Sequence, residues 1–346
     1  MSVDLKQPIK LKMATAWRTY IGGSKIRELH GEKSTKDDNF PEEWIMSTVP
    51  ARNSGREHIV EGISYLQDEN ITLAEFIEKN PIDALGNKHY EKYGAKLGVL
   101  VKLIDSAERL TVQVHPTRKK AMKLFNSQFG KTECWHIVDG RVIDGEEPCI
   151  YFGFKEGITR EYWKKCFDEQ NIEAMLGCLH KVKVKKGDTF LIEGGIPHAI
   201  GAGCFLVEIQ EPTDYTVRTE RVTPAGLQIS DFMCHQGLGF DKMFDCFEYK
   251  GYTIDQIQDR WNIKRNGDTI IDEANTDMFG LKMKDVTQKE YMDCKDTFSG
   301  IYILDGEGTI NGNAVKKGDQ FFIPAVCEGF TADGKMTYIQ YYGPQI

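Results

Sequence analysis

The stretch that decides the fold runs Val184-Lys185-Lys186-Gly187-Asp188-Thr189-Phe190-Leu191-Ile192. Two short apolar segments flank a Lys-Gly-Asp turn, and this pattern predicts a β-hairpin. A close copy follows later in the chain, at Val315-Lys316-Lys317-Gly318-Asp319-Gln320-Phe321-Phe322-Ile323. Such self-similarity within one chain indicates two copies of one β unit.

The first copy leads through a glycine-proline turn to His198. In the second copy Cys327-Glu328 stands roughly where His198 would be, so we expect that unit to bind no metal. Upstream, Gln113 and His115 are two residues apart in a β-branched run, which places both side chains on one face of a strand. The spacing predicts a chelating pair.

Glu133 opens another apolar run and offers a carboxylate at the mouth of a second strand. Together with Gln113, His115 and His198 it makes a mixed nitrogen and oxygen set. Such a set suits Zn²⁺ or another first-row divalent ion and leaves a position open for water or substrate. A lone strand histidine is more often structural, but the chelating spacing, the carboxylate and the third ligand together favour a metal site.

Composition restricts the class of protein. The chain has 346 residues, a net charge of -8 and a pI near 5.6, which argues against nucleic acid or an anionic membrane as partner. No apolar stretch reaches the 18 residues of a membrane span and no signal peptide is recognisable, so we expect a cytoplasmic enzyme. Nine scattered cysteines without a Cys-x-x-Cys pair predict reduced, mostly buried thiols.

The chain divides into a metal-binding domain at 1–225 and a degenerate C-terminal domain at 226–346. Residues 72–95 read as a helical insertion, in which Thr72 and Glu75 complete a capping box. Residues 98–104 predict a buried strand with Lys102 at a cleft, or with its ammonium reaching solvent. A helix over 161–170 is expected to have Tyr162, Cys166 and Phe167 along one side. Residues 301–312 are expected to form two strands around a tight turn.

Short strands, Gly-Asp turns and a degenerate second copy resemble the cupin fold, a double-stranded β-helix or jelly roll. The expected fold is therefore mainly β with helical insertions, in two cupin-like barrels of which the second lacks metal ligands. Four stretches resemble, in order, the signatures of the type I mannose-6-phosphate isomerases in their shorter bacterial form: Leu110–Pro116, Gly130–Trp135, Pro197–Gly203 and Thr213–Arg218.

The resemblance implies one zinc ion per chain, with ligands at Gln113, His115, Glu133 and His198. It also implies an isomerase that interconverts mannose 6-phosphate and fructose 6-phosphate through an enediol. The partner would be a small sugar phosphate, and the protein a monomer or homodimer. Some longer relatives have a histidine before the lysine of the Lys-x-Glu motif, whereas this chain has Gly130, so no ring-opening role can be placed there.

In that family the active-site arginine corresponds to Arg218, and the cleft lysines to Lys102 and Lys131. Thr111 occupies a serine position whose hydroxyl is associated with the substrate phosphate. Arg218 and Lys131 would supply positive charge to the enediolate or phosphate, although a surface ion pair with Glu220 or another nearby carboxylate is the alternative for Arg218.

The general base is not readable from the sequence. Glu208 is a candidate base and substrate-binding residue, or else a hydrogen-bond acceptor for a ligating histidine. His136, His180 and His235 read as structural. Two other functions stay open: an Fe²⁺-dependent cupin oxygenase, and a metal-binding paralogue that binds a sugar phosphate without turnover.

Overall fold

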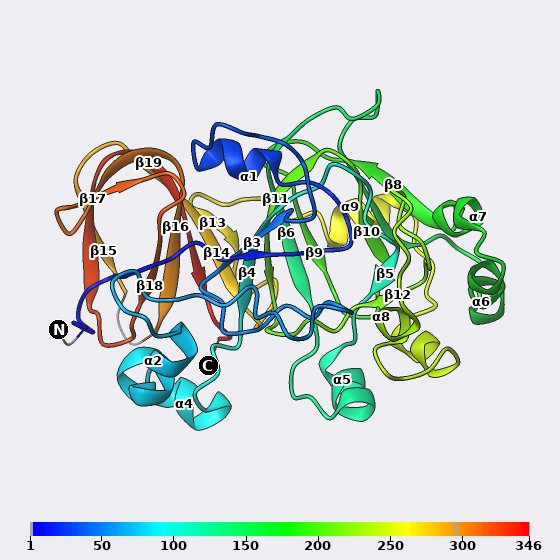
Figure 1. The fold of residues 1–346 in the computed structure, drawn as a ribbon, viewed down its shortest axis with the longest axis horizontal. Coiled ribbons are helices and arrows are strands. Elements are labelled where there is room, and N and C mark those ends of the chain that lie inside the picture. The colour runs from blue at the N-terminus through cyan, green and yellow to red at the C-terminus, as the bar shows by residue number, and fades with distance from the viewer. Residues whose placement is uncertain (1–2, 295–296, 346) are drawn as a thin grey trace.

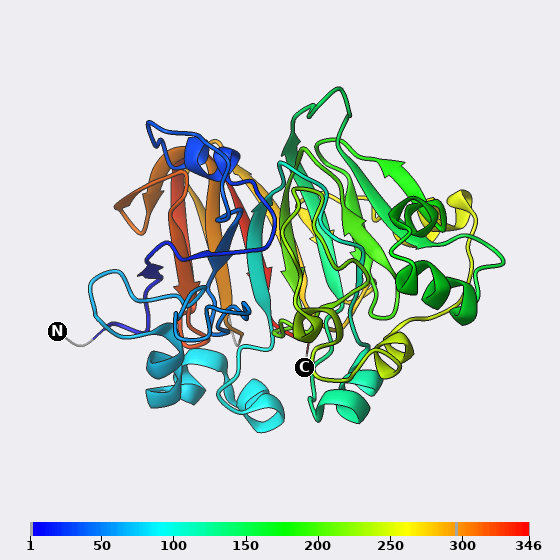
Figure 2. The same cartoon turned by 45° about the vertical axis from the view of Figure 1, so that its right-hand side comes forward.

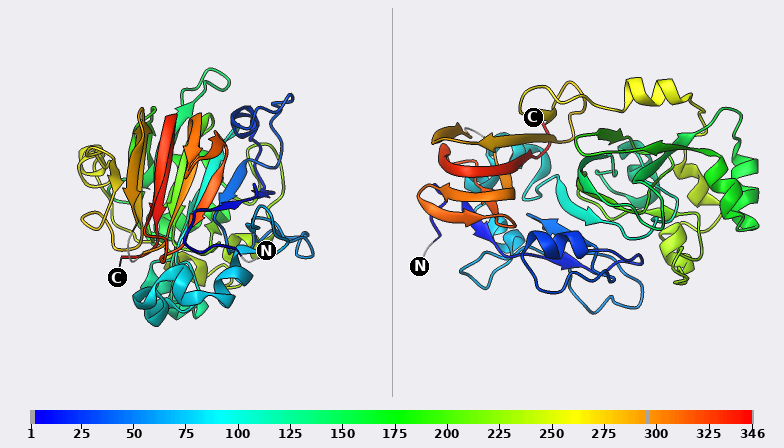
Figure 3. Two further views of the ribbon diagram at one scale, coloured as in Figure 1. Left: turned by 90° about the vertical axis from the view of Figure 1, so that its left-hand side faces the viewer. Right: turned by 90° about the horizontal axis from the view of Figure 1, so that it is seen from above.

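The computed structural model describes residues 3–294 and 297–345, which form a mainly β structure of three antiparallel sheets with helices at the periphery (Figure 1). Two β-barrels lie side by side, with the blue N-terminal segment running along one flank (Figure 3, right). This architecture confirms the expected cupin-type fold.

The first barrel consists of two facing sheets (Figure 2). The five-stranded sheet has the order β12 (Val217–Arg218), β5 (Gln113–Val114), β10 (His198–Ile200), β7 (Cys149–Phe154) and β8 (Leu179–Lys183). The six-stranded sheet has the order β2 (Thr15–Ala16), β3 (Glu42–Ile45), β4 (Leu100–Asp105), β11 (Cys204–Gln210), β6 (Glu133–Gly140) and β9 (Thr189–Ile192). Phe152 of one sheet meets Phe190 of the other at a ring distance of 6.5 Å.

The second barrel is built from one eight-stranded sheet. Its strands are β1 (Ile9–Leu11), β18 (Gln320–Ile323), β16 (Ser299–Ile310), β19 (Gly329–Tyr342), β14 (Gly280–Val286), β13 (Thr269–Ile271), β15 (Glu290–Asp293) and β17 (Asn313–Lys316). Strand β1 pairs with β18 although the first barrel separates them in the chain. The domain division near residue 225 stays a prediction.

The repeated Lys-Gly-Asp motif forms a turn in each barrel. Strands β8 and β9 belong to different sheets, so the predicted hairpin over 182–192 is wrong. Each turn has a left-handed glycine, Gly187 at φ 93° and Gly318 at φ 88°. Each aspartate then accepts a backbone N–H, Lys185 to Asp188 at 2.9 Å and Lys316 to Asp319 at 3.0 Å. The first turn leads the chain from β8, which pairs with β7, to β9, which pairs with β6 in the other sheet. After the second turn the chain stays in one sheet, since β17 and β18 both pair with β16.

The predicted turn within 301–312 is also wrong, because β16 continues to Ile310. Its register against β19 shifts between Ile303 and Asp305, and Gly306 absorbs this irregularity at φ 77°. A glycine with positive φ beside a register shift is typical of a β-bulge, which resembles a turn in sequence.

Helices cover the outside of the barrels. The insertion is helical as predicted, with the capping box at Thr72, in α2 (Leu73–Lys79), α3 (Pro81–Leu85) and α4 (Asn87–Tyr93). The others are α1 (Ser24–Leu29), α5 (Arg118–Phe125), α6 (Arg160–Asp168), α7 (Ile172–Gly177), α8 (Asp231–His235), η1 (Lys242–Cys246) and α9 (Ile254–Arg260).

In α6 the buried face contains Trp163, Cys166 and Phe167, which follow i, i+3, i+4 spacing. Tyr162 lies at the edge of this face and is 46% exposed. All nine cysteines are buried and free of disulfides in the described chain. Within residues 3–294 and 297–345, no helix has both the length and the apolar character needed to cross a bilayer.

Strand β3 connects the two barrels through a buried carboxylate. Glu43 is fully buried and accepts hydrogen bonds from Tyr302 of β16 at 2.8 Å and from Gln320 of β18 at 3.4 Å. The Nε2 atom of His30 lies 2.8 Å from the same carboxylate. Burial opposes the charged imidazolium, but Glu43 outweighs this and raises the pKa of His30 above its ordinary value.

We expect this pair to make stability depend on pH. A raised folded-state pKa gives stability that is fully present below the unfolded pKa of about 6.5 and is lost as pH rises through the folded pKa. The difference in unfolding free energy between wild type and His30→Gln should therefore be larger at pH 6 than at pH 9, as measured by urea denaturation. The exposed His58→Gln control should differ from wild type by less than about 0.5 kcal/mol. A difference for His30→Gln that does not change with pH would contradict the assignment.

Candidate metal centre and active-site cleft

Strand register brings three of the predicted site residues together. Gln113 on β5 pairs with His198 on β10 and, on its other side, with Arg218 on β12. Directly opposed residues on neighbouring strands project their side chains to the same face. Residues that lie far apart in the chain therefore meet in one cross-strand row.

The opposing sheet contributes Glu133. Its Oε2 atom lies 3.3 Å from Nε2 of His115, and its Oε1 atom lies 3.5 Å from Nε2 of His198. One ligand atom from each of these three buried residues lies within 4.8 Å of the other two. The amide nitrogen of Gln113 is 3.4 Å from Nε2 of His198, so all four predicted ligands converge.

Backbone carbonyls orient both imidazoles. Nδ1 of His115 lies 2.9 Å from the carbonyl oxygen of Tyr215, and Nδ1 of His198 lies 2.8 Å from that of Ile196. Because a carbonyl only accepts, each Nδ1 carries the proton, and each Nε2 presents a lone pair to the point that the carboxylate of Glu133 also faces. Burial and the charge of Lys131 lower the pKa of His115 to about 4, and burial also lowers that of His198.

These donors fit a divalent cation. Two neutral imidazole nitrogens and a carboxylate face one point, and Oε1 of Glu133 is buried without a hydrogen-bond partner. Lys131 places its ammonium against Glu133 and 3.0 Å from Nε2 of His115, which provides positive charge to the cluster. Although burial opposes ionisation, Lys131 and His115 hold the pKa of Glu133 well below its usual range. The set is the mixed nitrogen and oxygen type that binds Zn²⁺ with a position left open.

A second row of side chains forms the wall of the cleft. Register across β3, β4, β11 and β6 aligns Trp44, Lys102, Glu208 and Trp135. Nζ of Lys102 lies 3.0 Å from Glu208 and 4.8 Å from the Trp44 ring centroid, and Nε1 of Trp135 donates to Glu208 at 3.0 Å. Lys102 is 2% exposed, so it lies at the cleft and its ammonium does not reach bulk solvent.

Glu208 therefore binds Lys102 and Trp135. The sequence also allowed Glu208 to accept a hydrogen bond from a ligating histidine. The structure does not show this bond, because the Nδ1 atoms of His115 and His198 both donate to backbone carbonyls. Arg218 is buried, and its Nη1 donates to the carbonyls of Thr216 and Met233, each at 3.1 Å. The alternative partner Glu220 binds Arg109 instead, at 2.6 Å.

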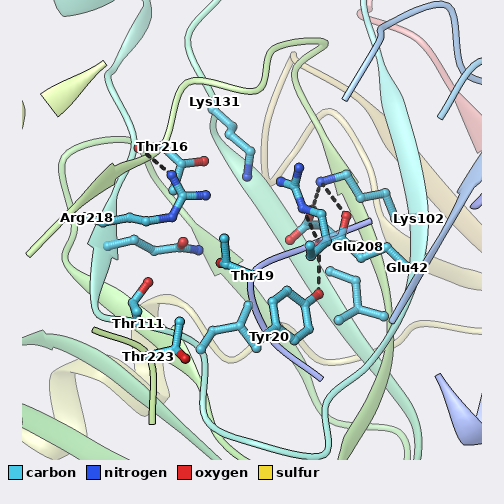
Figure 4. A pocket seen from close by; sticks show the side chains of 14 residues that line it. Thr19, Tyr20, Glu42, Lys102, Thr111, Lys131, Glu208, Thr216, Arg218 and Thr223 are labelled. Atoms are coloured by element: carbon cyan, nitrogen blue, oxygen red, sulfur yellow. Dashed lines mark hydrogen bonds and ion pairs between the residues drawn. The ribbon is translucent and has the colours of Figure 1, made fainter. Parts of the chain in front are cut away.

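Figure 4 shows the resulting cleft, with Arg218, Thr216 and Thr111 on one side and Lys102, Glu42 and Glu208 on the other. Lys131 projects between them. The lining includes four cationic side chains against two carboxylates, so the cleft favours an anion. Its cations are Arg18, Lys102, Lys131 and Arg218, and its carboxylates are Glu42 and Glu208.

Sequence reasoning missed Arg18, Tyr20, Glu42 and Asp214. Glu42 accepts from Tyr20 at 2.7 Å, from Trp44 at 2.7 Å and from Nε of Arg18 at 3.1 Å. Its place two residues before Trp44 on a short strand was the available signal, because such residues share a face. Nothing in the sequence joins Arg18 to Asp214, which are 196 positions apart.

Residues 213–216 hold several of these parts together. Thr213 donates to the carbonyl of Gly130 at 2.6 Å, beside Lys131, and Asp214 accepts from Arg18. The next two carbonyls accept from His115 and Arg218. We call residues 213–216 the strap, since this short segment fixes a metal ligand and a cleft cation at once.

Two family models match this chain. The phosphomannose isomerase type I catalytic domain matches residues 11–131, and the mannose-6-phosphate isomerase cupin domain matches residues 269–342. The chain belongs to the type I phosphomannose isomerase family.

Curated members of this family from Bacillus subtilis share about a quarter of their residues with it. "Probable mannose-6-phosphate isomerase GmuF" is 27% identical over 75% of this chain and 80% of its own length. Mannose-6-phosphate isomerase ManA is 28% identical over 70% of this chain and 73% of its own length.

Solved structures of phosphomannose isomerases share the fold. The B. subtilis mannose 6-phosphate isomerase superposes with a TM-score of 0.73 at 23% identity, over 97% of this chain and 99% of that one. A mannose 6-phosphate isomerase solved with bound zinc and yttrium also gives a TM-score of 0.73, at 15% identity over 98% of this chain and all of that one.

We expect loss of any one converging side chain to weaken metal binding. His115→Ala and Glu133→Gln should each lower Zn²⁺ affinity by about a hundredfold or more, since loss of an outer partner alone costs 10- to 100-fold. Chelator competition measures this directly. The control His136→Asn changes a buried histidine whose Nδ1 contacts the hydroxyl of Thr189 and should leave affinity unchanged. Equal losses in all three variants would indicate general destabilisation and not ligation.

Proposed function

We propose that this protein is a Zn²⁺-dependent isomerase that interconverts mannose 6-phosphate and fructose 6-phosphate. The observation that carries the proposal is the buried convergence of Gln113, His115, Glu133 and His198 beside a cation-rich cleft. Family membership and the zinc in one relative's structure support it. The nine reduced thiols are consistent with action in the cytoplasm.

The phosphate and the reacting carbons would occupy opposite sides of the cleft. Arg218 with the hydroxyl of Thr111 forms the side suited to a phosphate, because the guanidinium has no carboxylate partner in the described chain. Lys102 and Glu208 form the other side and would face C1 and C2 of the open-chain sugar. Lys131 projects between the two sides and would supply charge to the sugar oxygens.

Proton transfer would use Glu208. As a carboxylate it would remove the proton from C2, the C–H electrons would form the C1=C2 bond of the enediol, and O1 would take a proton from the ammonium of Lys131. The protonated Glu208 would then return its proton to C1, while the hydroxyl at O2 would give its proton back to Lys131 and become the ketone. Lys102 and Trp135 hold the carboxylate in place through an ion pair and a hydrogen bond. A divalent ion held by the four ligands would polarise the sugar oxygens and lower the barrier to the enediol.

A coupled assay with mannose 6-phosphate tests the activity. Zn²⁺-loaded protein should form fructose 6-phosphate, chelator should abolish this, and added Zn²⁺ should restore it. Arg218→Ala should lower kcat/KM by about 10²- to 10³-fold, the usual cost of one electrostatic contact to the reacting species. Sugar binding without turnover would favour a binding paralogue, and Fe²⁺-dependent oxygen consumption would favour an oxygenase.

The base assignment has its own test. Glu208→Gln should lower kcat by about 10²- to 10⁴-fold, as expected for loss of a general base, while Zn²⁺ content stays at one per chain. In D₂O the wild type should exchange solvent deuterium into C1 of fructose 6-phosphate, as seen by NMR, and the variant should not. The control Glu248→Gln changes a carboxylate outside the cleft lining. Wild-type exchange rates in Glu208→Gln would assign the proton transfer to another residue.

A further inference from the structure

Arg218 is an unusual buried cation. It is 8% exposed, and its Nη1 donates to two backbone carbonyls and to no carboxylate within residues 3–294 and 297–345. Burial, followed by the nearby charge of Arg18, lowers the pKa of Arg218 to about 10. A buried guanidinium without a counter-ion is costly, so a free carboxylate nearby would bind it.

Such a carboxylate lies four residues upstream. Asp214 is 7% exposed and belongs to the strap, which leads directly into β12 and Arg218. Its charge favours the protonated form of Arg218, and its partner Arg18 lines the same cleft as Arg218. If this side chain were free to turn, it would compete with an incoming anion for Arg218.

Arg18 occupies that carboxylate. Its Nη2 donates to Oδ1 of Asp214 at 2.9 Å and its Nη1 donates to Oδ2 at 3.2 Å, the bidentate geometry of a strong pair. Oδ2 also accepts the backbone N–H of Arg52 at 3.1 Å. Arg18 in turn donates through Nε to Glu42. Two carboxylates therefore neutralise Arg18, and none of them reaches Arg218.

We propose that Arg18 is a positioning residue that holds Asp214 away from Arg218 and thereby keeps Arg218 free to bind the substrate phosphate. The inference rests on the proposed function, because it takes Arg218 to be the phosphate-binding cation. It assigns Arg18 no contact with the substrate. Removal of the charge of Arg18 releases Asp214 to pair with Arg218, and removal of both charges leaves Arg218 free again.

Calorimetric titration of Zn²⁺-loaded protein with inorganic phosphate tests this without turnover. Arg18→Gln should weaken phosphate binding roughly tenfold or more, the value of one charge-assisted hydrogen bond. The double variant Arg18→Gln/Asp214→Asn should bind phosphate with an affinity within about twofold of wild type. This difference is well below the tenfold change that corresponds to about 1.4 kcal/mol. In the coupled assay KM for mannose 6-phosphate should rise in Arg18→Gln with kcat little changed, and fall again in the double variant.

Two controls define the background. Arg56→Gln breaks the Arg56–Glu61 ion pair outside the cleft lining and should leave phosphate affinity unchanged. Arg218→Ala should abolish the binding, which places the titrated ion at Arg218. Circular dichroism and thermal unfolding check that each variant folds.

Each result decides the matter. A double variant that stays as weak as Arg18→Gln would show that Arg18 touches the anion itself and would overturn the inference, as would Arg18→Gln with wild-type affinity. Either result leaves the isomerase proposal standing. Wild-type protein that binds no phosphate, or binding that survives Arg218→Ala, would overturn both. If Arg18→Gln fails to fold, the double variant can still be measured, because it has no unpaired carboxylate at Asp214. Its phosphate affinity then decides whether Arg18 positions Asp214 (wild-type affinity) or contacts the anion itself (weakened affinity).

Discussion

The register of β5 against its two neighbours is the constraint on which the site depends. Gln113 lies opposite His198 on one side and Arg218 on the other, so a single pairing places a predicted metal ligand beside a second ligand and beside the cleft cation. A slip of one residue would turn every side chain of the strand to the other face. Strand β5 has only two residues, and therefore its surroundings must fix the register.

The strap, residues 213–216, is one of the segments around β5 that can fix its register. Buried Glu211, just before it, accepts from the backbone N–H of Thr132 at 3.1 Å, next to Lys131 and Glu133. The strap then donates to Gly130 and accepts from His115 and Arg218. Because one segment contacts residues from both sheets of the first barrel, the metal centre and the anion-binding side of the cleft are held in a fixed relation.

The sequence predicted those parts of the site whose signal is local. Spacing of two placed Gln113 and His115 on one face, and a glycine-rich turn marked His198. The Lys-Gly-Asp copies indicated the repeated barrel, although the first turn joins strands of two different sheets. A short sequence does not specify which sheet the next strand joins. Arg18 and Asp214 escaped prediction because these two side chains pair across 196 positions of the sequence. A buried ion pair between distant segments leaves no periodicity in either one.

Alternate side chains of β3 face the cleft and the second barrel, and this links the two barrels structurally. Glu42 points into the cleft, while its neighbour Glu43 points the other way and is bound by Tyr302 and Gln320. The second barrel thus supports β3 from behind, where this strand forms one wall of the cleft. A shortened chain lacking β16 and β18 would remove two hydrogen-bond donors from the buried carboxylate of Glu43, one residue from Glu42. Loss of the second barrel would therefore loosen the strand that holds Glu42 at the cleft of the first.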